Sequence, residues 1–131
     1  MKVQLDDISL ACDDVGSGPT VLLIHGFPLC RRMWQPQARA LAAAGYRVIA
    51  PDLRGFGDSA APAGPYSMSV FADDMIRLLD HLQIDKAVVG GMSMGGYVLL
   101  NLLERHPGRA SAALFLVTRA GADDDAGKVK R

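Results

Sequence analysis

The chain has 131 residues, half of them hydrophobic, and its 14 basic residues balance 14 acidic ones. This composition is typical of one globular domain and excludes a disordered chain, and the absence of a basic patch argues against nucleic acid as a partner. The N-terminus lacks the apolar core of a signal peptide and no apolar run reaches transmembrane length, so no membrane partner is expected.

Two cysteines, Cys12 and Cys30, are too few for a disulfide framework. The chain also has no CxxC motif and no cluster of histidine and cysteine. We therefore expect two reduced thiols in a cytoplasmic protein, with neither a metal nor a cofactor.

The first part of the chain alternates turn residues with apolar runs. Residues 3–10 alternate loosely and are expected to form an edge strand, and the chemistry of residues 13–19 predicts a turn. The continuous apolar run at 21–24 predicts a strand buried on both faces of a sheet. A helix is expected over 33–44, with Gly45 as its C-terminal stop.

The same alternation continues to the end of the chain. A strand over 46–50 leads into a loop over 53–65 that is rich in Gly, Pro, Asp and Ser. Ser69 is expected to cap the next helix, whose apolar residues recur at helical spacing. A short strand over 86–90 then precedes a helix over 97–105, and residues 112–117 form a last apolar strand.

Strands that alternate with helices and are almost entirely apolar predict an α/β fold, with a mostly parallel sheet and helices on both faces. In such sheets the ligand site lies beyond the carboxyl ends of the strands. His25, Asp52, Ser93 and the segment after Val117 are therefore expected on one rim.

The segment from Gly91 to Gly95 fits the pattern G-x-S-x-G. It lies between a predicted strand and a predicted helix, which is the context of a nucleophile elbow. A Cβ at either glycine would collide with the neighbouring strand and helix. Ser93 has an alternative interpretation as an ordinary helix N-cap, but a cap alone would not require glycine on both sides.

Three segments in this order resemble the α/β-hydrolase fold superfamily: residues 25–28 (His-Gly-Phe-Pro), residues 52–59 and residues 91–96. Within it the chain resembles the serine hydrolase branch of esterases and 3-oxoadipate enol-lactonases. Haloalkane dehalogenases and epoxide hydrolases carry aspartate at the elbow, so Ser93 argues against both. The resemblance implies hydrolysis of a small-molecule ester or lactone without a cofactor.

The resemblance also assigns residue roles. Ser93 matches the nucleophile, and the backbone amides of Phe27 and Met94 match the two donors of an oxyanion hole. Gly26 would let the backbone approach the substrate and Pro28 would stiffen the loop, whereas the alternative for both is an ordinary turn. His25 belongs to this loop, and the aspartates of the 52–59 loop are interpreted as turn chemistry.

No base or acid for Ser93 is evident. His106 lies at the far end of the helix that Ser93 begins, roughly 20 Å away at a rise of 1.5 Å per residue. His81 is expected at the opposite end of the sheet, and His25 is assigned to the oxyanion loop. Residues 123–125 are three aspartates that are either candidate acids or, as we favour, an acidic helix start.

In this superfamily the acid and the histidine follow the serine along the chain. Residues 1–131 are therefore interpreted as the N-terminal part of a single domain, without a lid or the final strands and inactive alone. The strand at 112–117 would then be an exposed apolar edge, open to self-association or to pairing with a complementary chain. The alternative is a non-catalytic small-molecule-binding or interaction module on the same fold.

Overall fold

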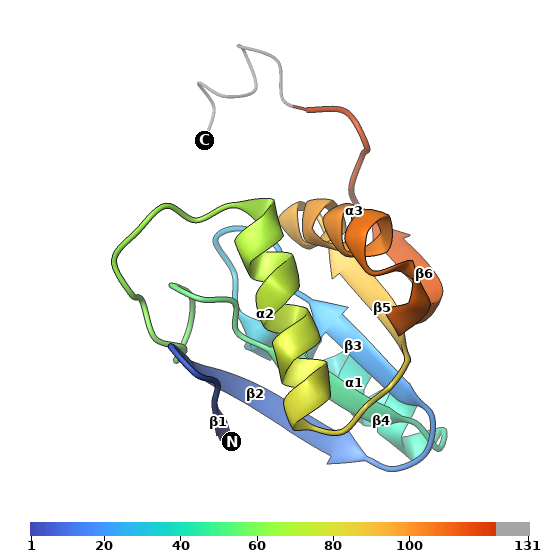
Figure 1. Cartoon of the computed structure of the whole chain (residues 1–131). Coiled ribbons are helices and arrows are strands. Elements are labelled where there is room, and N and C mark those ends of the chain that lie inside the picture. The colour runs from blue at the N-terminus through green and yellow to red at the C-terminus, as the bar shows by residue number, and fades with distance from the viewer. Residues whose placement is uncertain (123–131) are drawn as a thin grey trace.

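A six-stranded sheet in the order β1-β2-β4-β3-β5-β6 organises residues 1–122, which are the residues that the structure, a computed structural model, describes (Figure 1). Strands β4, β3, β5 and β6 run parallel to one another, and β2 pairs antiparallel with both β1 and β4. The predicted mostly parallel sheet is confirmed. The strands are β1 (Lys2–Gln4), β2 (Ser9–Gly16), β3 (Thr20–Ile24), β4 (Arg47–Pro51), β5 (Ala87–Met92) and β6 (Ala110–Leu116).

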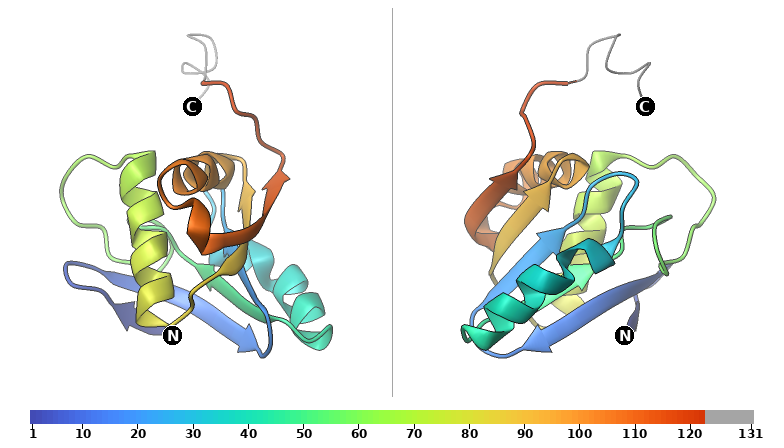
Figure 2. Two further views of the ribbon diagram at one scale, coloured as in Figure 1. Left: turned by 45° about the vertical axis from the view of Figure 1, so that its right-hand side comes forward. Right: turned by 180° about the vertical axis from the view of Figure 1, so that it is seen from behind.

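Helices cover both faces of this sheet, as predicted (Figure 2). Helix α1 lies against β2 and β4 on one face, whereas α2 and α3 pack together on the other face. The helices are α1 (Gln35–Ala43), α2 (Met68–His81) and α3 (Met94–Arg105), with short 3₁₀ helices η1 (Arg31–Trp34) and η2 (Pro107–Arg109).

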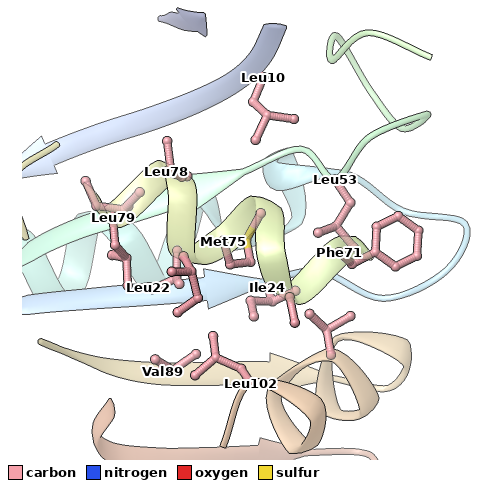
Figure 3. Packing of buried hydrophobic residues seen from close by; sticks show 14 of the residues in the cluster. Leu10, Leu22, Ile24, Leu53, Phe71, Met75, Leu78, Leu79, Val89 and Leu102 are labelled. Atoms are coloured by element: carbon pink, nitrogen blue, oxygen red, sulfur yellow. The ribbon is translucent and has the colours of Figure 1, made fainter. Parts of the chain in front are cut away.

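Strand β3 is buried on both faces, which confirms the prediction from its continuous apolar run. Because side chains alternate along a strand, Leu22 and Ile24 enter the larger core beneath α2 and α3 (Figure 3). Val21 and Leu23 enter the smaller core on the α1 face, where Trp34 is also buried. The central strand thus joins two hydrophobic cores and fixes the rim on which it ends.

The first sixteen residues differ from the prediction. They form a hairpin of β1 and β2 rather than one edge strand, and β2 continues to Gly16 through residues expected to form a turn. Residues Cys12–Gly16 pair antiparallel with β4, and the Asp14 carboxylate accepts two hydrogen bonds from Arg47. Tertiary pairing therefore overrides the turn preference of the two aspartates.

Helix boundaries also differ at their N-terminal ends. The cap of α2 is Ser67, whose hydroxyl accepts a hydrogen bond from the Val70 amide at 3.2 Å, and not Ser69. The helix expected from residue 33 begins with a 3₁₀ turn. Its predicted stop at Gly45 is confirmed, since Gly45 has φ +90°, a left-handed conformation that ends a helix. Helix α3 starts at Met94, directly after Ser93, instead of at residue 97.

Strand β6 forms an edge of the sheet and exposes apolar side chains. Leu114 and Phe115 are 45% and 46% exposed, and no strand among residues 1–122 pairs with the outer side of β6. This arrangement agrees with the expectation of an exposed apolar edge at 112–117. In the same part of the chain no helix has the length and apolar character needed to cross a membrane, and Cys12 and Cys30 are free thiols.

Candidate active site

Ser93 occupies a sharp turn between β5 and α3. Its backbone has φ +53° and ψ −115°, a conformation that non-glycine residues rarely adopt and that is strained. Its side chain makes no capping hydrogen bond, although Ser93 stands at the N-cap position of α3. The conformation therefore matches the predicted elbow, and the simple N-cap interpretation lacks its defining hydrogen bond.

Glycine is required on both sides of this serine for steric reasons. A Cβ at Gly91 would lie 2.2 Å from the carbonyl oxygen of Gly95, and a Cβ at Gly95 would lie 2.4 Å from the carbonyl oxygen of Ile24. The first contact is with the helix and the second with the neighbouring strand, as the sequence predicts. These close approaches press the first turn of α3 against the end of β3.

The His25–Pro28 segment passes directly beside Ser93. A Cβ on Gly26 would lie 3.1 Å from the Cβ of Ser93 and 3.0 Å from the carbonyl oxygen of Met92. This absence of space explains the glycine at position 26, and the peptide bond between Phe27 and Pro28 is cis. The structure therefore brings the two predicted motifs together at the carboxyl ends of β3 and β5.

His25 is fully buried, and both of its ring nitrogens have partners. The Leu53 amide donates to Nε2 at 3.0 Å, so Nδ1 carries the proton and donates to the Gly26 carbonyl oxygen at 2.9 Å. Burial lowers the pKa of His25, which keeps the ring neutral. His25 is thus a structural link between its own loop and the loop after β4, and its nitrogens are not available to Ser93.

The buried carboxylate of Asp52 lies at the start of the loop after β4 and connects this loop to the segment that follows the His25–Pro28 loop. It accepts hydrogen bonds from the backbone amides of Arg31 at 2.7 Å and Asp58 at 2.8 Å, and it pairs with the Arg31 guanidinium. Burial opposes the charge of Arg31, but hydrogen bonds to Asp58, Asp13 and Asp52 outweigh it and raise the pKa of Arg31. Asp52 therefore has a structural function, and Arg31 is a contributor that sequence reasoning missed.

The other two histidines lie away from Ser93. His81 is the last residue of α2, at the end of the helix remote from the carboxyl end of β5 (Figure 1). His106 follows the twelve residues of α3, which places it roughly 20 Å from Ser93 at 1.5 Å per residue. Neither can reach the hydroxyl, and the aspartates at 123–125 lie outside the described residues.

An aromatic group borders the site. Phe27 is 51% exposed and contacts the Phe56 ring edge to face at a centroid distance of 6.0 Å. Phe56 also contacts His25 and Phe71. Trp34, by contrast, is buried in the smaller core, so its role is packing.

Thr118 is a second contributor, which the sequence analysis placed on the rim only as part of the segment after Val117 and did not single out. Its hydroxyl donates to the Ser93 carbonyl oxygen at 2.8 Å, and the Ser93 amide donates to the carbonyl oxygen of Leu116 at 3.0 Å. The available signal was its position, since a polar residue directly after an apolar parallel strand falls on the ligand-binding rim.

The sheet, the strained serine and the adjoining His-Gly loop together define an α/β-hydrolase architecture. A family model described as "alpha/beta hydrolase fold" matches residues 19–128, and the chain belongs to this family.

Named relatives agree with this assignment. The chain is 34% identical over 115 residues to the AB hydrolase superfamily protein YisY of Bacillus subtilis (strain 168), covering 88% of this chain and 43% of that protein. It is 41% identical over 116 residues to an epoxide hydrolase of Caballeronia sordidicola, covering 87% of this chain and 35% of that protein.

Among solved structures, a thermophilic esterase from Thermogutta terrifontis superposes with a TM-score of 0.91 at 40% identity. The superposition covers 99% of this chain and 50% of the esterase. The chain therefore spans half the length, or less, of these relatives.

Proposed function

We propose that this chain carries the nucleophile and the oxyanion hole of a serine hydrolase that acts on carboxylic esters or lactones. The observation that carries the proposal is the strained conformation of Ser93 at the N-terminus of α3, where its hydroxyl makes no capping hydrogen bond. Strain of this kind persists only where the surrounding structure enforces it, and it is concentrated at functional sites. The similarity to an esterase supports the choice of ester substrates.

In the proposed reaction the Oγ of Ser93 attacks the substrate carbonyl carbon, and the carbonyl oxygen becomes an oxyanion. The Phe27 amide has no hydrogen-bond partner within residues 1–122 and is available to donate to this oxyanion. The Met94 amide is also available, because the first amides of a helix have no intrahelical partner. Each such donor stabilises a transition state by about 3 kcal/mol.

Ester hydrolysis is favoured over epoxide hydrolysis by the chemistry of serine. Acyl transfer to Oγ gives an ester, which water cleaves by attack on its carbonyl carbon to regenerate the hydroxyl. Ring opening of an epoxide by Oγ would give an ether, which has no carbonyl carbon and would leave Ser93 permanently alkylated. The epoxide hydrolase relatives therefore support the fold of this chain more than its reaction.

The proton of Ser93 requires a base that none of the three histidines supplies. We propose that the base and the acid come from polypeptide beyond the described residues, and that the 131-residue chain alone has negligible turnover. This same observation favours the second candidate for the chain alone, a module that binds a small molecule without turnover.

Phenylboronic acid tests the nucleophile without requiring a base in place. Its boron gains a bond to Oγ, the hydroxyl proton is released to solvent, and a tetrahedral anion resembling the reaction intermediate results. We expect the ¹¹B resonance to move from trigonal to tetrahedral on titration, together with the ¹⁵N resonances of Phe27 and Met94. Ser93→Ala should abolish these changes, whereas Ser111→Ala on exposed β6 should leave them intact.

No adduct with the folded wild-type chain, or an adduct that survives Ser93→Ala, would refute the proposed nucleophile. Hydrolysis of 4-nitrophenyl acetate by the 131-residue chain at the rate of a complete esterase would refute the external base.

A further inference from the structure

The segment Leu116–Thr118 holds the nucleophile elbow from the side opposite the His25–Pro28 loop. The Ser93 backbone takes part in three hydrogen bonds, and two of them involve this segment. Its amide donates to Leu116, and its carbonyl oxygen accepts from the Gly96 amide at 2.9 Å and from the Thr118 hydroxyl at 2.8 Å. Both lone pairs of the Ser93 carbonyl oxygen are therefore in use.

The contact between Thr118 and the first turn of α3 is tight. A Cβ at Gly96 would lie 2.3 Å from the Thr118 hydroxyl oxygen and 2.6 Å from its Cβ. The helix can therefore carry only glycine at this position if Thr118 is to reach Ser93. The requirement for Gly96 is thus separate from the requirements of Gly91 and Gly95.

Val117 turns the chain so that both of its neighbours reach Ser93. It has φ +47°, which is exceptional for a β-branched residue, and its side chain is 88% exposed. The side chain gains almost no burial in return for this conformation. The strain is therefore maintained by the hydrogen bonds of Leu116 and Thr118 on either side.

The carbonyl oxygen of Ser93 and the amide hydrogen of Met94 belong to one planar peptide group and point in opposite directions. Fixing the oxygen therefore fixes the direction of the Met94 N–H. A hydrogen bond accepted by the oxygen also polarises the peptide group and strengthens its N–H as a donor.

From this geometry we propose that Thr118 is a positioning residue for the oxyanion hole, which acts through the Ser93–Met94 peptide group. This inference rests on the proposed function. It adds that one hydroxyl, from the segment after β6, sets the direction and the strength of the Met94 donor.

The test compares variants that differ by the hydroxyl alone. Thr118→Val keeps the shape of threonine and removes its hydroxyl, and Thr118→Ala differs from Thr118→Ser by one hydroxyl group. We expect Thr118→Val and Thr118→Ala to bind phenylboronic acid about five- to tenfold more weakly, the equivalent of one neutral hydrogen bond, and Thr118→Ser to keep wild-type affinity. The ¹⁵N resonance of the free Met94 amide should move in the two weak binders only.

Thr20→Val, a change in the other threonine at the start of β3, should alter neither the affinity nor the Met94 resonance. Urea unfolding of every variant distinguishes the positioning role from a purely structural one. If the role of Thr118 is purely structural, its variants lower the stability and leave the affinity of the folded protein unchanged. That outcome would overturn the inference.

If Thr118→Val does not fold, the alanine and serine pair decides the question, and equal affinities of that pair refute the inference. The proposed function fails separately, because it requires only that wild-type Ser93 forms the adduct.

Discussion

Replacing Gly95 by alanine isolates the steric demand of the elbow. The new methyl group would lie 2.4 Å from the carbonyl oxygen of Ile24 and 2.8 Å from that of His25. Both oxygens belong to backbone at the buried end of β3, which is held between two parallel neighbours. The clash can be relieved only if α3 moves away from the sheet.

The size of the effect follows from two opposing terms. Overpacking of a buried site costs about 1–3 kcal/mol, and contacts with backbone place Gly95→Ala near the upper end. Alanine recovers up to about 1 kcal/mol through its better helix propensity. The net loss is about 2 kcal/mol, which for a 131-residue chain corresponds to a decrease in Tm of about 7 °C.

Urea unfolding followed by tryptophan fluorescence measures this loss, because Trp34 is the chain's single tryptophan and is buried. Gly108→Ala is the matched control, since its new methyl group meets no atom within 4 Å. We expect Gly108→Ala to change the free energy of unfolding by less than about 0.5 kcal/mol. Equal midpoints for the two variants would refute the steric account of the elbow.

Three further predictions concern the loops and the sheet edge. Asp52→Asn should lower the free energy of unfolding, measured in urea, by about 3 kcal/mol, because the buried Asp52 carboxylate loses its charge and with it the interactions with two backbone amides and one guanidinium. Asp80→Asn, a change at an exposed carboxylate, should have a clearly smaller effect, and equal losses for the two variants would contradict this prediction. Burial lowers the pKa of His25 below its ordinary 6.5, so as the pH falls His25 takes up a proton in the unfolded chain before it does so in the folded chain. The free energy of unfolding should therefore be retained above about pH 6.5 and decline below it. Chemical denaturation at a series of pH values should show that His25→Gln removes this decline and that His81→Gln keeps it. Phe115→Lys on β6 should reduce self-association in analytical ultracentrifugation, and a wild-type chain that sediments as a monomer at all concentrations would exclude pairing through this edge.

The alternation of apolar runs and helical patterns was sufficient to predict the mostly parallel sheet. Val21 to Ile24 could be recognised as a central strand because no residue in the run is polar. The G-x-S-x-G pattern could be placed between a strand and a helix for the same local reason. Helix starts were less predictable, since Ser67 and Ser69 are equally good caps and only the packing of α2 selects between them.

By itself the sequence determined which residues can form the elbow, because the spacing of Gly91, Ser93 and Gly95 and the chemistry of a hydroxyl are local properties. Only the tertiary structure decided what holds that elbow in place. Thr118 and Arg31 reach Ser93 and Asp52 across 25 and 21 positions of the chain, and such contacts depend on strand order and register. No local pattern encodes them, because they exist only after the sheet has brought separate loops onto one rim.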